Sequence, residues 1–454
     1  MKILLINPIT YGSIDTFIED SKRMKINTDE PIGLMYLAAK YIKEGHDAEI
    51  LDLQIETLKY RKFDKEIISI ILQARLNKFK PDMVGISFLY ELNKDCALWV
   101  AQRVKEYDSN IKTIAGGLYA SMMDELPYID EILKGDQTPN WMELKPYRDN
   151  LLIGEYGILG RTVIDRVYKE NCRVATIQIS RGCPCKCTYC SGHAITKRKY
   201  THRPVNDITE EIKELKEKYD IEVFIFNEEN NGVNLKKTKE LYKALIPLDI
   251  KWISNAGFYV SNMDQEFVNL AMDSGLLYFN LAFESGSKRL LRELKKSEKI
   301  VDNAKQIMNW IREKNDLMYC IGFFMFGFAN ETWDDVYTSM EFMKGLDLDW
   351  YQVNMLQVFK GTDLYDDYKK NGNIGKIKDA HYLSSTVENS IIPANELNAY
   401  IQQNLNIGLN FLNNRTLRKG NFLQCRRDMQ HILNITNNEH SYAKKIMEVL
   451  GCSY

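Results

Sequence analysis

The sequence predicts an α/β protein in which two β/α units are followed by a helical region. Short apolar runs alternate with amphipathic segments over residues 1–135 and again from about residue 173, as is typical of parallel strands covered by helices. Residues 137–170 lose this alternation because prolines and glycines interrupt them. We predict a Rossmann-like (flavodoxin-like) domain over 1–145, a connector over 146–172, a barrel-like unit over 173–370 and a helical domain over 371–454.

The N-terminal domain is expected to contain four strands and three helices in alternation. Its first helix has Pro31 near the first turn and Gly45 just after the end, the positions that these residues favour. Parallel sheets of this kind bind ligands at the carboxyl ends of their strands, which here carry Asn7, Ser87 and Gly116. The predicted strands are 2–7, 48–53, 82–88 and 112–117, and the predicted helices are 31–44, 65–79 and 94–106.

The second unit is expected to contain roughly six β/α repeats, which predicts a full or partial barrel with its active site at the strand C-termini. The C-terminal helices could close the mouth of this barrel, and Tyr351, Asn354 and Gln357 are candidate lining residues. The predicted strands are 174–180, 223–227, 251–254, 278–283, 319–326 and 351–356, with helices over 207–219 and 236–245 among the connections.

The bulk composition excludes several classes of partner. Hydrophobic residues make up 45% and charged residues 27% of the chain, and the net charge is −2. Such a balance gives no overall field toward nucleic acid or anionic lipid. The most apolar later stretch, 319–329, is shorter than the ~20 residues of a membrane helix. The N-terminus is too short and too polar for a signal peptide. We predict a cytoplasmic protein with neither a nucleic-acid nor a membrane partner.

Four of the nine cysteines lie within eight consecutive positions, in SRGCPCKCTYCSG. In a reducing compartment such a cluster more often holds metal than forms disulfides. Cys183, Cys187 and Cys190 follow a predicted strand and can supply three thiolates to a cubane cluster, leaving its fourth iron without a protein ligand. A zinc site completed by Cys185 and His193 is the alternative, although four ligands on so short a loop would strain it.

At this point the residues resemble a known family. RGCPCKCTYC is similar to the signature of radical S-adenosylmethionine (SAM) enzymes, with an aromatic residue before the last cysteine. The resemblance implies a [4Fe–4S] cluster on Cys183, Cys187 and Cys190. It also implies that SAM binds the open iron and is cleaved reductively to a 5′-deoxyadenosyl radical. Cys185 is an additional cysteine at a position that is often aromatic, and packing is its simplest role.

Two further stretches resemble SAM-binding motifs of that family. FIFNEENNGVN (224–234) is similar to an acidic motif at a strand end, so Glu228 or Glu229 would hold the SAM ammonium group, and a carboxylate is a natural partner for a cation. LAFESGS (281–287) is similar to the turn that meets the ribose hydroxyls, through Glu284. Tyr189, in the cysteine loop, is the fourth residue that we assign to SAM. Without the cysteine loop, a solvated surface would be the simpler interpretation of the carboxylates.

The N-terminal domain resembles the cobalamin-binding domain that precedes the barrel in one large subgroup. The similar stretches are EPIGLMYLAAKYIKEGHDAEILD (30–52), PDMVGIS (81–87) and AGG (115–117). The resemblance implies that the corrin and its nucleotide tail lie across the strand ends, where glycine permits close approach. Tyr119 stands where histidine is usual after the glycine pair. The residues assigned to cobalamin are Ser87, Phe88, Leu89, Tyr90, Gly116, Gly117 and Tyr119.

Taken together, the chain is identified as a member of the cobalamin-dependent radical SAM enzymes and resembles the class B methyltransferases. The resemblance implies methylation of an unactivated carbon in a small metabolite or natural-product precursor, with an external electron donor such as flavodoxin or ferredoxin. The alternative is a radical SAM rearrangement, cyclisation or oxidation in which cobalamin is absent or not used for methyl transfer. The sequence assigns no catalytic residue beyond the cofactor ligands, nor the substrate or the oligomeric state.

Overall fold

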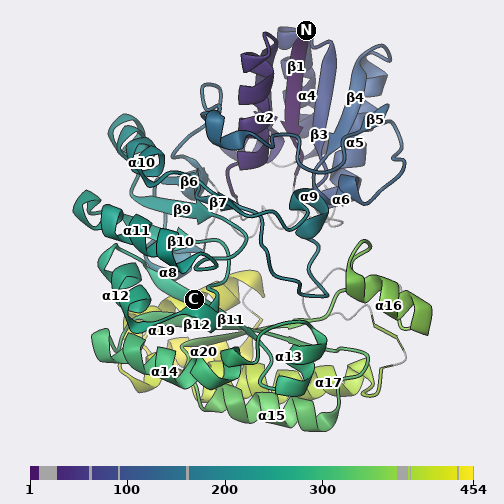
Figure 1. The fold of residues 1–454 in the computed structure, drawn as a ribbon. Coiled ribbons are helices and arrows are strands. Elements are labelled where there is room, and N and C mark those ends of the chain that lie inside the picture. The colour runs from purple at the N-terminus through teal and green to yellow at the C-terminus, as the bar shows by residue number, and fades with distance from the viewer. Residues whose placement is uncertain are drawn as a thin grey trace.

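The computed structural model describes residues 1–9, 28–60, 64–89, 93–159, 163–375, 387–388, 390–436 and 439–452. The N-terminal sheet stands at one end of the molecule, the strands of a partial barrel occupy the middle, and most of the later helices gather at the far end (Figure 1). None of the helices in these described ranges is both long and apolar enough to cross a membrane.

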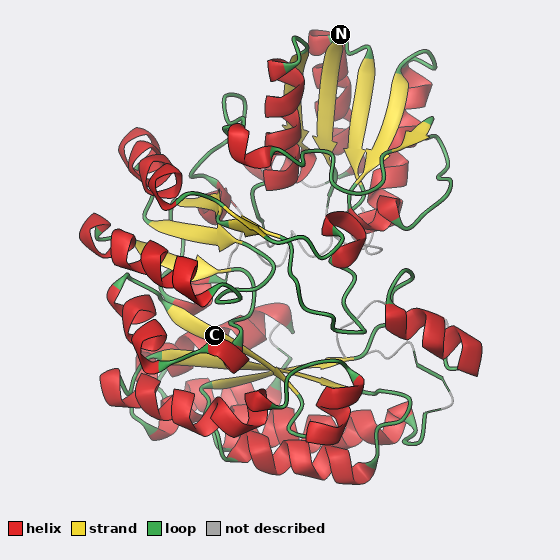
Figure 2. Cartoon of the chain, in the orientation of Figure 1, coloured by secondary structure: helices red, strands yellow, loops and turns green. Residues whose placement is uncertain are grey.

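The N-terminal domain is a parallel sheet in the order β2-β1-β3-β4-β5, with helices on both faces (Figure 2). This is the flavodoxin-like order, so the predicted fold of the domain is confirmed. The strands are β1 Lys2–Asn7, β2 Asp47–Asp52, β3 Met83–Ser87, β4 Lys112–Gly116 and β5 Glu131–Ile132. The helices are α2 Ile32–Lys43, α3 Leu53–Lys59, α4 Lys65–Phe79, α5 Lys94–Tyr107 and α6 Leu118–Ser121.

Local sequence signals set the ends of these elements. Pro31 precedes α2, and Gly45 follows it with φ +86°, a conformation that glycine adopts without strain. The Asp64 side chain accepts a hydrogen bond from the Ile67 amide and so caps α4. Since β1 and β3 are neighbours in the sheet but not in the chain, the connections diverge between their C-terminal ends. A ligand crevice is expected there.

Short elements connect this domain to the barrel and lead into the cysteine loop. They are η2 Trp141–Glu143, α7 Tyr156–Leu159, α8 Ile164–Val167, β7 Ser180–Arg181, α9 His193–Thr196 and β8 Thr201–His202. Glu30, just before α2, fixes the two domains to each other. Its Oε2 accepts hydrogen bonds from the amide of Thr176 at 2.7 Å and from Nη1 of Arg148 at 3.3 Å. Arg148 also donates to the carboxylate of Glu211 at 2.7 Å, so a buried network of ion pairs links the two domains.

Six parallel strands form the partial barrel, in two sheets with the orders β10-β9-β6 and β11-β12-β13. Single bridges between Trp252 and Leu276 and between Phe258 and Leu281 connect the two sheets, so the predicted partial (β/α)6 barrel is confirmed. Its strands are β6 Val174–Gln178, β9 Val223–Asn227, β10 Lys251–Ser254, β11 Tyr278–Glu284, β12 Tyr319–Phe326 and β13 Trp350–Met355.

The helices of the barrel lie between these strands in sequence. They are α10 Val205–Tyr219, α11 Leu235–Leu245, η3 Ile246–Leu248, η4 Val260–Asn262, α12 Gln265–Asp273, α13 Lys288–Glu293, α14 Lys299–Lys314 and α15 Trp333–Lys344. The later elements are α16 Asp363–Asn371, α17 Ala394–Ile401, the π-helix η5 Gln402–Leu412, α18 Arg415–Arg418, α19 Phe422–Ile435 and α20 Ser441–Val449.

The expectation that the C-terminal helices close the barrel mouth is wrong for α19 and η5. Asp428 of α19 accepts hydrogen bonds from Arg166 at 2.9 Å and from Tyr319, the first residue of β12, at 2.8 Å. The Asn410 amide of η5 bonds the backbone N–H and C=O of Tyr351, near the start of β13. These helices therefore cover the strand N-termini and the free edge of β13, where unpaired backbone groups require partners.

Candidate active site

The cysteine loop begins at a backbone position that only glycine fits well. Gly182 has φ +82°, and a Cβ at this position would overlap the Lys199 carbonyl oxygen and lie 2.8 Å from its carbonyl carbon. The pairing of β7 with β8, in which Arg181 faces Thr201, brings the two segments this close. The Gly182 amide donates to Oε2 of Glu229 at 2.8 Å. The loop therefore leaves the barrel along a fixed path just before its first cysteine.

The far end of the loop is fixed to other parts of the barrel. The Thr188 amide donates to the Leu294 carbonyl at 3.1 Å, and the Thr188 carbonyl accepts from the Leu364 amide at 2.9 Å. The Tyr189 hydroxyl donates to Oε1 of Glu284 at 3.2 Å. The end of β11, the residue after α13 and the start of α16 thus all contact this segment.

The three predicted cluster cysteines lie on this loop as free thiols, and the Cys190 amide donates to the Cys187 carbonyl at 3.3 Å. Cys183 is partly buried, with its Sγ 3.6 Å from Nδ2 of Asn230. In the part of the chain that the structure describes, no three histidine, cysteine, aspartate or glutamate side chains gather closely enough to bind one metal ion. Three thiolates that each bind a different iron do not require such convergence, so this donor set fits a cubane cluster.

The two acidic residues after β9 have different environments. Glu228 is buried, its Oε1 accepts hydrogen bonds from Asn231 at 2.7 Å and Ser254 at 3.3 Å, and burial raises its pKa to about 7. Its other oxygen has no protein partner in the described ranges. Burial also raises the pKa of Glu229, whose carboxylate is already engaged by the Gly182 amide. Both residues line the cavity, and Glu229 is the more exposed of the two, so both stay candidates for a ligand contact.

Glu284 ends β11 with φ +66°, an unusual conformation for a residue other than glycine, and a register shift separates it from Ala282. Its Oε1 accepts from both the Tyr189 hydroxyl and Nζ of Lys296, the latter at 2.7 Å. The structure therefore brings together Tyr189 and Glu284, two residues that the sequence assigned separately to SAM. It also adds Lys296, which no motif indicated.

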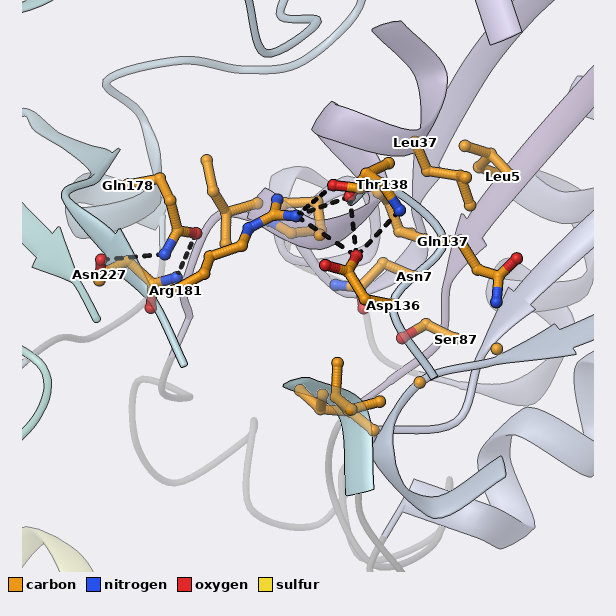
Figure 3. Close-up of a pocket in the computed structure, with 18 of the residues that line it drawn as sticks. Leu5, Asn7, Leu37, Ser87, Asp136, Gln137, Thr138, Gln178, Arg181 and Asn227 are labelled. Atoms are coloured by element: carbon orange, nitrogen blue, oxygen red, sulfur yellow. Dashed lines mark hydrogen bonds and ion pairs between the residues drawn. The ribbon is translucent and has the colours of Figure 1, made fainter. Parts of the chain in front are cut away.

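A cavity of about 680 Å³ lies between the strand C-termini of the N-terminal domain and the first half of the barrel. Figure 3 shows its labelled side chains, with Leu5, Asn7, Leu37 and Ser87 on the N-terminal side and Gln178 and Asn227 on the barrel side. Glu228 and Glu229 also line it, so the acidic strand end opens into the same space.

The seven residues that the sequence assigned to cobalamin lie in different places around this cavity. Its lining includes Ser87, Leu89, Gly116 and Gly117. Phe88 and Tyr119 are buried in the apolar core of the N-terminal domain. The Phe88 carbonyl accepts a hydrogen bond from the Tyr119 amide at 3.1 Å. Tyr90 lies outside the described residues. Assignment of these residues to cobalamin stays a prediction.

The lining of the cavity combines glycines with polar side chains. At Gly33 and Gly116 a Cβ would meet no atom within 4 Å, so the missing side chains leave the floor open. Asp29 and Asp136 supply carboxylate acceptors at the wall. Cobalamin has a flat ring with carboxamide side chains around it, and glycine floors with polar walls accommodate such a shape.

Sequence reasoning missed several polar residues of this site. Asp136, Thr138 and Gln178 line the cavity and belong to none of the motifs. Arg181 also lines it and stands first in the cysteine motif, but it was given no role. Its place directly before Gly182 and Cys183 is the one sequence signal that could have marked Arg181 as a site residue. The others lie in the irregular stretch before the barrel and at its first strand, where local patterns carry no signal.

Comparison with known proteins agrees with this division of the chain. The B12 binding domain family matches residues 27–143, and the Radical SAM superfamily matches residues 177–343. The first match covers the flavodoxin-like sheet from α2 onward. The second begins in β6, just before the cysteine loop, and ends within α15.

Several relatives match most of the chain. An uncharacterised methyltransferase of Pyrococcus horikoshii is 27% identical over 81% of this chain and 83% of its own length. Cytidylyl-2-hydroxyethylphosphonate methyltransferase of Streptomyces wedmorensis is 23% identical over 72% of each chain. The radical SAM methyltransferase TsrM of Kitasatospora setae, at 15% identity, shares the fold with a TM-score of 0.62 over 84% of this chain and 79% of its own. This chain is a radical SAM enzyme with an N-terminal B12-binding domain.

Proposed function

We propose that the protein transfers a methyl group from SAM to a carbon atom of a small molecule, using a [4Fe–4S] cluster and cobalamin. The observation that carries the proposal is the cavity in which the strand ends of the B12-binding domain face the acidic strand end beside the cysteine loop. Two relatives that match most of the chain are named as methyltransferases. When bound, the cluster supplies one electron to cleave SAM, and cobalamin carries the methyl group.

The protein's own residues bind and orient these groups. Cys183, Cys187 and Cys190 would hold the cluster. The second oxygen of Glu228 would accept a hydrogen bond from the SAM ammonium, whose charge would favour the ionised carboxylate. Glu229 and Glu284 act on the loop itself, since they hold Gly182 and Tyr189. Glu229 and Glu284, two of the four residues predicted to bind SAM, would thus hold the loop that carries the cluster cysteines. Tyr189 would belong to the same hydrogen-bond network.

We infer that the electron comes from an acidic carrier protein, such as flavodoxin or ferredoxin, in the cytoplasm. Exposed Lys186, Lys197 and Lys199 surround the start of the cysteine loop and have no ion-pair partner within the described ranges. Arg198 joins them, with Nη1 2.6 Å from the Cys185 carbonyl. A basic surface at the point where the electron enters favours an acidic donor, through electrostatic steering that weakens as salt increases.

The test is anaerobic reconstitution with iron, sulfide and hydroxocobalamin, followed by metal analysis and incubation with SAM labelled in its methyl group. About four irons and one cobalt per chain, with label transferred to a carbon of an added candidate substrate, support the proposal. Iron without cobalt would contradict the role of cobalamin. Bound cobalt with no label in any product, but with deoxyadenosine formed, would contradict methyl transfer.

A second function has one specific observation in its favour. Anaerobic magnesium-protoporphyrin IX monomethyl ester cyclase of Rubrivivax gelatinosus is 23% identical over 74% of this chain and 66% of its own length. That relative is named for ring closure rather than methylation. The labelled-methyl experiment separates the two functions, because cyclisation leaves the label in SAM or its by-products.

A further inference from the structure

The guanidinium of Arg181 lies between two aromatic rings from distant parts of the chain. Its Cζ is 4.7 Å from the ring centroid of Tyr36, on α2, and 4.8 Å from that of Trp141, in η2. The two rings meet edge to face, with their centroids 5.7 Å apart. Both aromatic residues are almost fully buried, so the cation stacks in a largely desolvated place where cation–π attraction is strongest.

The same guanidinium binds the wall of the interdomain cavity. Nη1 of Arg181 donates to Oγ1 of Thr138 at 2.6 Å and lies 3.6 Å from Oδ1 of Asp136. The Thr138 amide donates to that Asp136 oxygen at 2.9 Å, so the segment is closed on itself and on the arginine (Figure 3). Residues 135–138 all line the cavity.

Arg181 is also adjacent to the cysteine loop. Gly182 follows it directly, bound to Glu229, and Cys183 comes next. Nε and Nη2 of Arg181 form no hydrogen bond within the described part of the chain, and 13% of the side chain is exposed. Since Arg181 itself lines the cavity, these N–H groups are available to a ligand there. One side chain thus touches the cavity wall, the cavity space and the backbone that leads to the first cluster ligand.

We propose that Arg181 is a positioning residue that couples the interdomain cavity to the cluster loop. A ligand that fills the cavity fixes residues 135–138 and the free N–H groups of Arg181, and the arginine transmits this order to Gly182 and Cys183. The coupling is reciprocal, so order in the loop also favours a formed cavity wall. The inference rests on the proposed function only in taking cobalamin as the ligand of the cavity.

The test measures amide hydrogen exchange, by mass spectrometry, in peptides that cover 134–141 and 182–190 of the reconstituted full chain. Without cobalamin, Arg181→Gln is expected to speed exchange at least about tenfold in both peptides, which corresponds to ~1.4 kcal/mol of local stability. Arg181→Lys keeps the charge but loses the planar fork, so its effect should be intermediate. Arg173→Gln, which removes an exposed ion pair with Glu155 instead, is the matched control and should change neither peptide.

A second variant keeps the test decisive if Arg181→Gln does not fold. Thr138→Val removes the hydroxyl acceptor on the cavity wall and should speed exchange at 182–190, where it has no contact of its own. Hydroxocobalamin should then slow exchange in both peptides of the wild type, in 134–141 alone when Arg181 is Gln, and in 182–190 only partly when it is Lys.

The outcomes separate the two hypotheses. If the Arg181 variants speed exchange only in 182–190, and Thr138→Val speeds it only in 134–141, the coupling is refuted even when cobalamin binds normally. If cobalamin fails to bind the wild type while the variants still loosen both peptides, the choice of cofactor is refuted and the role of Arg181 stands.

Discussion

The Gly182→Ala substitution tests the geometry at the start of the cysteine loop. The left-handed backbone at φ +82° costs any residue with a Cβ about 1–2 kcal/mol. The added methyl group would overlap the Lys199 carbonyl, and such forced overpacking costs ~1–3 kcal/mol more. The expected loss of unfolding free energy is therefore roughly 2–5 kcal/mol, measured by urea denaturation of the cluster-free protein. Because the overlap displaces Cys183, iron content after reconstitution should also fall well below that of the wild type.

Two other glycines separate the causes of this effect. Gly372 has φ +73° with no atom within 4 Å of a Cβ, so Gly372→Ala carries only the backbone cost of about 1–2 kcal/mol. Gly192 has φ −56°, and its Cβ would make an ordinary contact at 3.5 Å with Sγ of Cys190. Gly192→Ala should therefore cost little unfolding free energy in the cluster-free protein. The reasoning is refuted if Gly182→Ala unfolds like Gly372→Ala and still takes up iron like the wild type.

Three further substitutions test the cluster, the carboxylate and the base of the barrel. Cys187→Ala should abolish assembly of the intact cluster, read by iron and sulfide analysis, while Cys452→Ala should not change it. In the folded protein the raised pKa of Glu228, about 7 against 4.5, costs stability as pH rises through that window. Glu228→Gln should therefore gain on the order of 3 kcal/mol relative to wild type between pH 4.5 and 7.5, and an equal change at both ends would contradict the burial. Asp428→Ala leaves the buried Arg166 without its carboxylate and should cost ~3–5 kcal/mol in denaturant unfolding, whereas a loss below 1 kcal/mol would mean that the pair is hydrated.

Local pattern was sufficient for most of the secondary structure. Strand β1 and helix α4 lie where apolar runs and helical spacing predicted them, because period and capping act over a few residues. The flavodoxin-like sheet and the partial barrel followed from the alternation of strands and helices, since parallel strands require crossover connections. The domain boundaries at 145, 172 and 370 stay predictions.

The interactions among the site residues could not be predicted in the same way. Glu229 was assigned to SAM from its motif, but the strand register places its carboxylate at the Gly182 amide. Lys296 donates a hydrogen bond to Glu284, which follows a register shift at the end of β11. Short-range sequence patterns do not specify such pairings.

The sequence by itself determined the chemistry of this protein. Three cysteines at fixed spacing after a strand limit the possible metal groups, because thiolate number and loop length set what they can hold. Only the tertiary structure decided that α19 and η5 cover the strand N-termini and the edge of the barrel and that Arg181 contacts the cavity wall beside the cluster loop. The physical reason is range: propensity and spacing act between neighbours in the chain, whereas a buried cation pairs with whatever partner the packed fold places beside it.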